Sequence, residues 1–239
     1  MEDQGSISLN KYISQTGICS RREADKWIEA GRVKLNGEVA RKGNRVAPGD
    51  VVLLDGQEIN KGVKTVYLLL NKPAGITCTT DLRDKSNIID FLNYKERIFP
   101  VGRLDKASTG LILLTNDGDI VNKILREENY HEKEYEVRVN RPINTAFIRR
   151  MSNGIPILGT VTKKCKVERL KKFVFRITLT QGLNRQIRRM CEHLGYDVLA
   201  LKRTRIMHLK LGQLKIGAYR HLNSGELRSL LKKVASSKK

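Results

Sequence analysis

Residues 101–118, with the sequence VGRLDKASTGLILLTNDG, constrain the fold more than any other stretch of the chain. A short apolar segment comes first, a polar loop then carries Arg103, Asp105 and Lys106, and the apolar run 111–114 follows a turn of small residues. This order predicts a strand, a tight polar loop and a buried strand. Cations on both sides of a loop carboxylate favour its ionised form. On this stretch alone, a surface aspartate in an ordinary turn is the alternative.

The first quarter of the chain predicts a small domain of two helices and a hairpin. Residues 8–31 have the spacing of two short helices, and the second begins at the capping-box sequence SRRE. Alternating residues around the Asn36-Gly37 pair then predict a β-hairpin. The polar, glycine-containing stretch 55–64 predicts a linker.

The rest of the chain predicts a second domain built on a sheet. The apolar run 66–70 indicates a fully buried strand, and helical patterns at 119–126, 144–151, 184–195 and from 224 onward separate further strands. We therefore expect an α+β protein, with a small αα-β domain and linker in residues 1–62 and a mixed, mainly antiparallel sheet with flanking helices in residues 63–239. The further strands are expected at 131–139, 160–169, 173–180, 197–201 and 204–211.

The strand expected at 131–139 carries charged residues at alternate positions. Period-two alternation places Glu132, Glu134, Glu136 and Arg138 on one face, and it places Tyr135 on the other face with Val137 and Val139. An inward tyrosine needs a hydrogen-bond partner for its hydroxyl. A core tyrosine bonded to the backbone explains the pattern equally well.

The helix expected at 184–195 is amphipathic and rich in arginine. Arg188 lies at the edge of its apolar face, from which a guanidinium can reach inward, whereas Arg185 and Arg189 are expected to point outward.

The positive charge of the chain is concentrated towards its C-terminus. Residues 1–62 carry 10 basic and 9 acidic side chains, residues 63–162 carry 15 and 12, and residues 163–239 carry 21 and 4, for a net charge of +21. Such a surplus predicts a polyanionic partner. Aromatic residues make up only 5% of the chain, so contacts from Lys and Arg to phosphates are more plausible than a surface of stacked bases.

Several kinds of site are disfavoured by the sequence. The four cysteines have no pair at metal-ligand spacing, which argues against a zinc site and for a reduced cytoplasmic chain. Neither a P-loop nor a dinucleotide-binding fingerprint is present, and no apolar stretch approaches the length of a membrane span. We therefore expect a protein without metal, organic cofactor or membrane contact.

The N-terminal sequence LNKYISQTGICSRREADKWIEAGRVKLNG resembles the S4-type RNA-binding domain. The near-neutral charge of this segment leaves solvated surface charges as the alternative to RNA contact. The resemblance implies that the helix pair and the hairpin present a set of basic side chains to RNA phosphates, namely Lys11, Arg21, Arg22, Lys26, Arg41, Lys42 and Arg45.

Three later segments resemble the signatures of the RsuA-type pseudouridine synthases in order and separation: GRLDKASTGLILLTNDGD, KEYEV and GLNRQIRRMCEHLGY. The resemblance implies isomerisation of a uridine in RNA to its C-glycoside, without metal or organic cofactor. An enzyme that acts on a base must draw it out of its stack into a pocket.

The same resemblance implies roles for individual residues. Asp105 would be the catalytic carboxylate, Tyr135 would stack on the flipped uracil and be the candidate base for the C5 proton, and Arg188 would pair with Asp105. A phenol is protonated at neutral pH, so the base role is the most demanding of these. The implied substrate-binding residues are Arg103, which would support the extruded nucleotide or occupy its place, Ile187 at the pocket floor, and Lys106, Arg185 and Arg189.

Two further functions stay open on the sequence. A non-catalytic RNA-binding or ribosome-assembly protein would have lost signature residues, yet Asp105, Tyr135 and Arg188 are all present. A nuclease would need clustered acids for a metal or a pair of histidines. The expected substrate is a hairpin of 23S ribosomal RNA, with a transfer RNA loop as the alternative, and the expected state is a monomer with no obligate protein partner.

Overall fold

The computed structural model describes residues 5–60, 62 and 64–237, and the chain divides into two compact units. The first unit ends at Thr65 and also includes Tyr94–Arg97, and the second comprises Val66–Asn93 and the residues from Ile98 onward. The division follows the stretch that the sequence predicts as a linker. Local sequence patterns do not predict that Tyr94–Arg97 belongs to the first unit, because this segment directly follows a helix of the second.

The first unit contains the two helices and the hairpin that the sequence predicts. The hydroxyl of Ser20 accepts a hydrogen bond from the Glu23 amide at 3.1 Å and so caps the second helix. Leu35 pairs with Glu38 across the Asn-Gly turn. The elements are β1 (Ile7–Ser8), α1 (Leu9–Gln15), α2 (Arg21–Glu29), β2 (Val33–Leu35), β3 (Glu38–Val39), β4 (Arg45–Val46), β5 (Val52–Leu54) and β6 (Gln57–Glu58).

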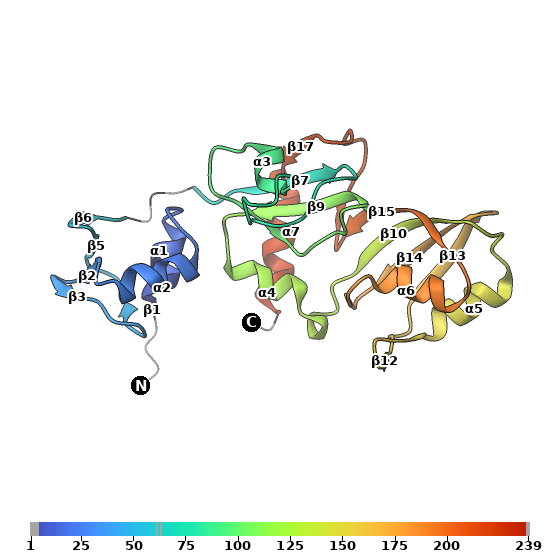
Figure 1. Ribbon diagram of the computed structural model, residues 1–239, viewed down its shortest axis with the longest axis horizontal. Helices are drawn as coiled ribbons and strands as arrows, with labels where there is room; N and C mark the ends of the chain where they lie inside the picture. Colours follow the sequence, from blue (N-terminus) through green and yellow to red (C-terminus); the bar gives the residue numbers. More distant parts are fainter. Residues whose placement is uncertain (1–4, 61, 63, 238–239) are drawn as a thin grey trace. The chain divides into compact units, whose positions relative to one another are not determined.

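The second unit is a mixed sheet with helices on it, which confirms the predicted fold class (Figure 1). The strand order is β13-β14-β10-β15-β9-β7-β17, with β16 beside β15 and β8 beside β9. Among the described residues, β15 and β9 form the parallel pair of this sheet and its other pairs are antiparallel. The strands are β7 (Tyr67–Lys72), β8 (Phe99–Val101), β9 (Thr109–Thr115), β10 (Lys133–Val139), β11 (Pro156–Ile157), β12 (Thr160–Val161), β13 (Lys166–Lys171), β14 (Val174–Leu179), β15 (Val198–Ile206), β16 (Leu209–Lys210) and β17 (Tyr219–His221).

Two groups of helices cover different parts of the sheet. Figure 1 shows α5 and α6 beside β13 and β14, where Phe147 and Met190 join a core with Phe175 and Val137. A second core lies under β7 and β9 and includes side chains of α4 and α7. The helices of this unit are α3 (Ile88–Leu92), α4 (Asp119–Leu125), α5 (Thr145–Asn153), α6 (Gln186–His193) and α7 (Ser224–Ala235), with a 3₁₀ turn at Glu127–Asn129. In the part of the chain that the structure describes, no helix has the length and apolarity needed to cross a bilayer.

Three predicted strands are wrong in their bounds. The strand expected at 160–169 is broken, because Thr162 is buried and bonded to Ile155 through both its amide and its hydroxyl. The separate strands expected at 197–201 and 204–211 are joined as β15, which ends at Ile206. The buried Arg203 at the centre of β15 interrupts the apolar pattern that a buried strand normally shows, so the sequence suggested a break there.

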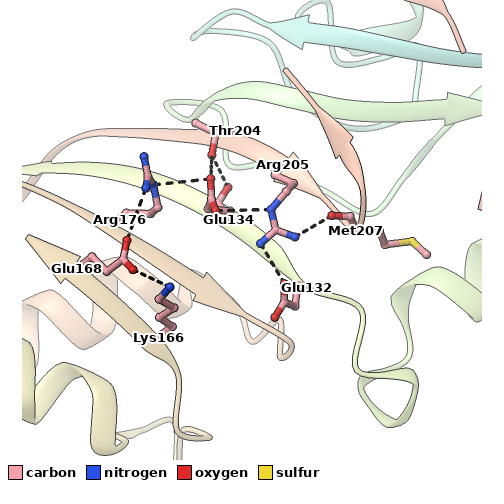
Figure 2. Close-up of polar contacts among 8 residues, drawn as sticks. All are labelled: Glu132, Glu134, Lys166, Glu168, Arg176, Thr204, Arg205 and Met207. Carbon is pink, nitrogen blue, oxygen red and sulfur yellow. Dashed lines mark hydrogen bonds and ion pairs between the residues drawn. The ribbon is translucent and has the colours of Figure 1, made fainter. Parts of the chain in front are cut away.

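The sheet face opposite Tyr135 carries a network of paired charges, which we call the charge ladder (Figure 2). The Glu134 carboxylate lies 3.5 Å from Arg205 Nε and 3.7 Å from Arg176 Nε. The β10–β15 register shifts at Thr204, which is the extra residue of β15 between the pairs made by Arg203 and Arg205. Its hydroxyl donates a hydrogen bond to the Glu134 carboxylate at 2.9 Å. The ladder therefore links the register shift beside Tyr135 to side chains of four strands, β10, β13, β14 and β15. Its charged members are Glu132, Glu134, Glu168, Lys166, Arg176 and Arg205.

Candidate active site

Asp105 lies on the loop between β8 and β9, and a buried lysine helps to fix that loop. Lys72 Nζ donates to the carbonyl oxygens of Pro73 at 2.8 Å, Ile76 at 2.7 Å and Lys106 at 3.4 Å. Burial lowers the pKa of Lys72, and the backbone carbonyls replace the water that its ammonium group loses. The loop that carries Asp105 is thus joined to the loop after β7.

Arg188 holds the Asp105 carboxylate from the first turns of α6. Its Nε lies 3.4 Å from Asp105 Oδ2 and its side chain is 15% exposed. Its other two nitrogens donate to the Val198 carbonyl at 3.2 Å and to the Ser108 hydroxyl at 3.4 Å. The guanidinium is therefore oriented by strand and loop before any substrate binds.

Arg185 also reaches Asp105, contrary to the expectation that it points outward. Its Nη1 lies 3.8 Å from Asp105 Oδ2, although its side chain is 50% exposed. The helix begins at Gln186, and Arg185 precedes it in a left-handed conformation with φ of 49°. Because Arg185 does not share the helical backbone, the face assigned to it by helical spacing is wrong.

The structure brings most of the predicted site residues to two adjoining cavities. A small one of about 80 Å³, which we call the base cavity, is lined by Asp105, Tyr135 and Ile187 together with Leu179 and Leu201. A larger one of about 860 Å³, which we call the groove, shares Asp105 and Tyr135 with the base cavity. The carboxylate and the tyrosine ring therefore lie where the two cavities meet. The predicted residues Arg103, Lys106 and Arg185 also line the groove.

The structure does not bring Arg189 to either cavity. Its Nε donates to the Asn184 carbonyl at 3.1 Å, and its Nη2 donates to the Asn184 side-chain oxygen at 3.4 Å. Arg189 therefore braces the turn that leads into α6.

The basic residues predicted for the first unit fall into two groups. Lys42 pairs with Glu29 at 2.9 Å, Lys26 lies 3.6 Å from Glu23, and Arg45 donates to the Ser6 hydroxyl at 2.7 Å. Those three cations are already engaged within the unit. The remaining predicted residues are Arg21, Arg22 and Arg41, which are exposed, and Lys11, which is half-buried.

Sequence reasoning missed three cations near the site: Lys72, Lys133 and Arg203. Lys133 is two residues before Tyr135 and lines the groove with it, so period-two alternation contained the signal. Arg203 lies where the sequence suggested a break between strands. Lys72 ends a run of buried residues in β7 and gives no local sign of its three carbonyl partners.

Comparison with known proteins identifies the family. The profile of the family described as RNA pseudouridylate synthase matches residues 66–193, more than half of the chain. The chain belongs to this family. The matched part of the synthase contains the Asp105 loop, β10 and α6, and the profile of the S4 domain matches residues 8–52.

Relatives agree with both assignments. The synthase is 58% identical over 239 residues to the dual-specificity RNA pseudouridine synthase RluF of Escherichia coli (strain K12), covering 99% of this chain and 82% of the relative. It is 35% identical over 231 residues to the ribosomal large subunit pseudouridine synthase B of Bacillus subtilis (strain 168), covering 93% of this chain and 94% of the relative. The chain is therefore an RNA pseudouridine synthase, an isomerase with an S4 domain.

A solved structure supports the fold. The crystal structure of a pseudouridylate synthase aligns with a TM-score of 0.69 at 30% identity, covering 94% of this chain and 99% of that one. Two segments of the sequence, LNKYISQTGICSRREAD and ILGTVTKKCKV, resemble the large-subunit ribosomal RNA pseudouridine synthase F, and the match to RluF confirms that resemblance.

Replacing Arg188 tests the geometry around Asp105. We expect Arg188→Met to lower kcat about 10³-fold and Arg188→Lys to lower it by about 10- to 100-fold, because an ammonium cannot hold the strand carbonyl and the carboxylate together. Single-turnover conversion of substrate RNA measures the effect. Arg150→Met, which removes an exposed cation from α5, is the matched control and should leave kcat unchanged. Equal rates for Arg188→Met and wild type would contradict the role of Arg188.

Proposed function

We propose that the base cavity isomerises a uridine in a hairpin of large-subunit ribosomal RNA, with Asp105 as the catalytic group. The observation that carries this proposal is the meeting of Asp105 and Tyr135 at one small cavity, with Arg188 behind the carboxylate at 3.4 Å. A carboxylate that is held ionised beside an apolar wall is a competent nucleophile. Arginine supplies the positive charge without losing its own proton.

The reaction makes and breaks bonds within a single nucleotide. The flipped uracil enters the base cavity and stacks on the Tyr135 ring, and Asp105 attacks the ribose at C1′ or the base at C6 while the C1′–N1 bond breaks. The ring then rotates, C1′ bonds to C5, the bond to the Asp105 oxygen breaks and returns the carboxylate, the C5 proton leaves and N1 gains a proton. Tyr135 is the candidate acceptor of the C5 proton, and this step needs a neighbour that takes the phenolic proton onward.

The remaining predicted residues bind the RNA around the reacting base. Ile187 closes the floor of the base cavity, and Arg103, which lines both cavities, supports the extruded nucleotide or occupies its vacated place. Lys106 and Arg185 contact the strand in the groove. Arg189 lines neither cavity, and the Nη1 end of its guanidinium, beyond the bonds to Asn184, would contact a phosphate outside them.

The RNA target is part of the proposal. The name of the Bacillus subtilis relative specifies the large ribosomal subunit, and the name of the Escherichia coli relative states dual specificity. The name does not say which second RNA is meant, and a transfer RNA loop, the alternative that the sequence left open, is the second candidate substrate. We further propose that the enzyme acts in the cytoplasm, where folded RNA is available to both units. We also propose that it acts as a monomer.

Mapping pseudouridines tests the target. Total RNA from cells with and without the gene should differ at a uridine in large-subunit ribosomal RNA, and re-expression of the gene should restore that modification. A difference confined to transfer RNA would support the second substrate. Identical maps in both RNA classes would contradict both.

The uneven distribution of charge predicts how salt affects RNA binding. We expect Arg185→Gln combined with Arg189→Gln to lower the slope of log affinity against log salt more than Arg21→Gln combined with Arg22→Gln does. Each lost phosphate contact should reduce the slope by about 0.7 to 0.9. Affinities measured between low and moderate salt give the slopes. Equal slopes for the two double variants would show that the C-terminal third does not carry the main phosphate contacts.

A further inference from the structure

Two buried cations line the groove beside Tyr135, and the proposed chemistry uses neither. Lys133 on β10 and Arg203 on β15 are 7% and 4% exposed. Arg203 pairs with Tyr135 across the two strands, and Lys133 shares the face of Tyr135 because it precedes that residue by two. Both cations line the groove together with Asp105.

Neither cation has a carboxylate partner in the part of the chain that the structure describes. Lys133 Nζ donates to the Thr180 carbonyl at 3.1 Å, and Arg203 Nε donates to the Leu111 carbonyl at 2.6 Å. Arg203 Nη2 is buried and has no hydrogen-bond partner among the described residues. A buried guanidinium nitrogen without an acceptor is costly to the fold, so its retention calls for an anion that the folded protein alone does not provide.

The charge of Arg203 also disfavours the charged form of Lys133. Burial, and then the charge of Arg203, lower the pKa of Lys133 to about 8, with Glu127 acting in the opposite direction. Glu127 itself pairs with Lys163 at 2.6 Å. An anion placed between Lys133 and Arg203 would remove this repulsion and restore the usual preference of lysine for its charged form.

The position of the two cations in the groove indicates which anion they bind. Lys133 and Arg203 line the groove, whereas Ile187, Leu179 and Leu201 line the base cavity. The uracil ring is neutral when it binds, and the charged group that RNA carries is its phosphodiester. Because Asp105 and Tyr135 lie between the two cavities, RNA whose target base fills the base cavity extends its backbone into the groove.

We propose that Lys133 and Arg203 form a binding site for one RNA phosphodiester close to the target uridine, and that this contact fixes the strand while the base occupies the base cavity. The inference rests on the proposed use of the base cavity. The site would bind backbone charge at one linkage, without reading the base sequence.

Neutralising single linkages tests the site. The probe is a stem-loop RNA that the enzyme has been shown to convert, made with one uncharged methylphosphonate at each linkage near the target uridine in turn. Wild type should bind the RNA about tenfold more weakly when the neutral linkage occupies the site. Lys133→Met should bind the unmodified RNA about tenfold more weakly and lose little more with that neutral linkage.

Two further variants complete the comparison. Arg203→Lys can keep the bond to the Leu111 carbonyl but lacks the additional nitrogens, so it too should lose its sensitivity to the neutral linkage. Lys202→Gln removes an exposed cation next to Arg203 in the chain and should respond to methylphosphonate as wild type does. We expect Lys133→Met to melt no lower than wild type, because an unpaired buried charge is removed. If it fails to fold, Arg203→Lys carries the same comparison.

The outcomes separate this site from the catalytic assignment. Equal methylphosphonate losses in wild type and in both cation variants would overturn the site, as would a wild type that is indifferent to charge at every linkage near the target. Affinity is measured on a stem-loop RNA that was chosen because the wild-type enzyme converts its target uridine. Normal turnover by an Asp105 variant would therefore remove the proposed chemistry and leave the phosphate comparison intact.

Discussion

Asp105→Asn is expected to abolish pseudouridine formation, with a fall in rate of about 10⁴-fold or more. The amide has nearly the shape of the carboxylate but is neither charged nor a comparable nucleophile. Folding and RNA affinity should change little, because the Asp105 backbone still accepts the Ser108 amide at 2.9 Å and the basic residues of the groove are intact. Conversion of a mapped substrate RNA and its equilibrium binding are the two measurements.

Asp119→Asn is the matched control for this experiment. Asp119 begins α4 beyond the buried strand β9, and it lines neither the base cavity nor the groove. Its replacement should leave turnover close to that of wild type. Turnover at the wild-type rate by Asp105→Asn would exclude Asp105 as the catalytic group. Loss of RNA affinity together with activity would instead indicate that the loop had collapsed.

Gly110→Ala is expected to have the largest effect on stability. A Cβ atom at Gly110 would lie 2.3 Å from the Arg203 carbonyl oxygen and 2.7 Å from its amide nitrogen, and the φ of +102° is one that residues with side chains rarely adopt. Because β9 and β15 pair at this point, the backbone cannot move away without opening the sheet. We expect a loss of about 4 kcal/mol or more, seen as a lower melting temperature of the second unit.

Gly75→Ala is the control that separates the cost of a positive φ from the cost of a steric clash of the new Cβ atom. Gly75 has a φ of +88°, yet nothing lies within 4 Å of the position that its Cβ would take. Its replacement should cost only about 1 kcal/mol, since the strained conformation is the single penalty. Equal losses in the two variants would show that the close approach of β9 and β15 is not what limits Gly110.

Most of the fold was predictable because its elements have strong local signals. The capping serine of α2, the Asn-Gly hairpin and the buried strand β7 each follow from residue type and spacing. The strand β15 was not, because a buried arginine at its centre is stabilised by a bond to Leu111, 92 residues earlier in the chain. A contact of that range leaves no mark in a local pattern.

The site was predictable to the same degree. Alternation placed Tyr135 on the inner face of its strand, and helical spacing placed Arg188 at the edge of the apolar face, while only the family resemblance implied that it pairs with Asp105. Arg185 departed from helical spacing because the helix starts at Gln186, two residues later than its sequence suggests. The phosphate site proposed at Lys133 and Arg203 required the register of β10 and β15, which only the structure supplies.

The charge ladder opposite Tyr135 has a consequence for how the enzyme searches among RNA molecules. Its three carboxylates and three cations balance one another, so the ladder presents no surplus positive charge and should release few counterions when a polyanion approaches. The chain as a whole has a net charge of +21, but RNA that contacts this balanced face gains little electrostatic binding free energy. Encounters there should be brief, and the productive face should keep a larger share of the time that the enzyme spends bound to abundant, unmodifiable RNA.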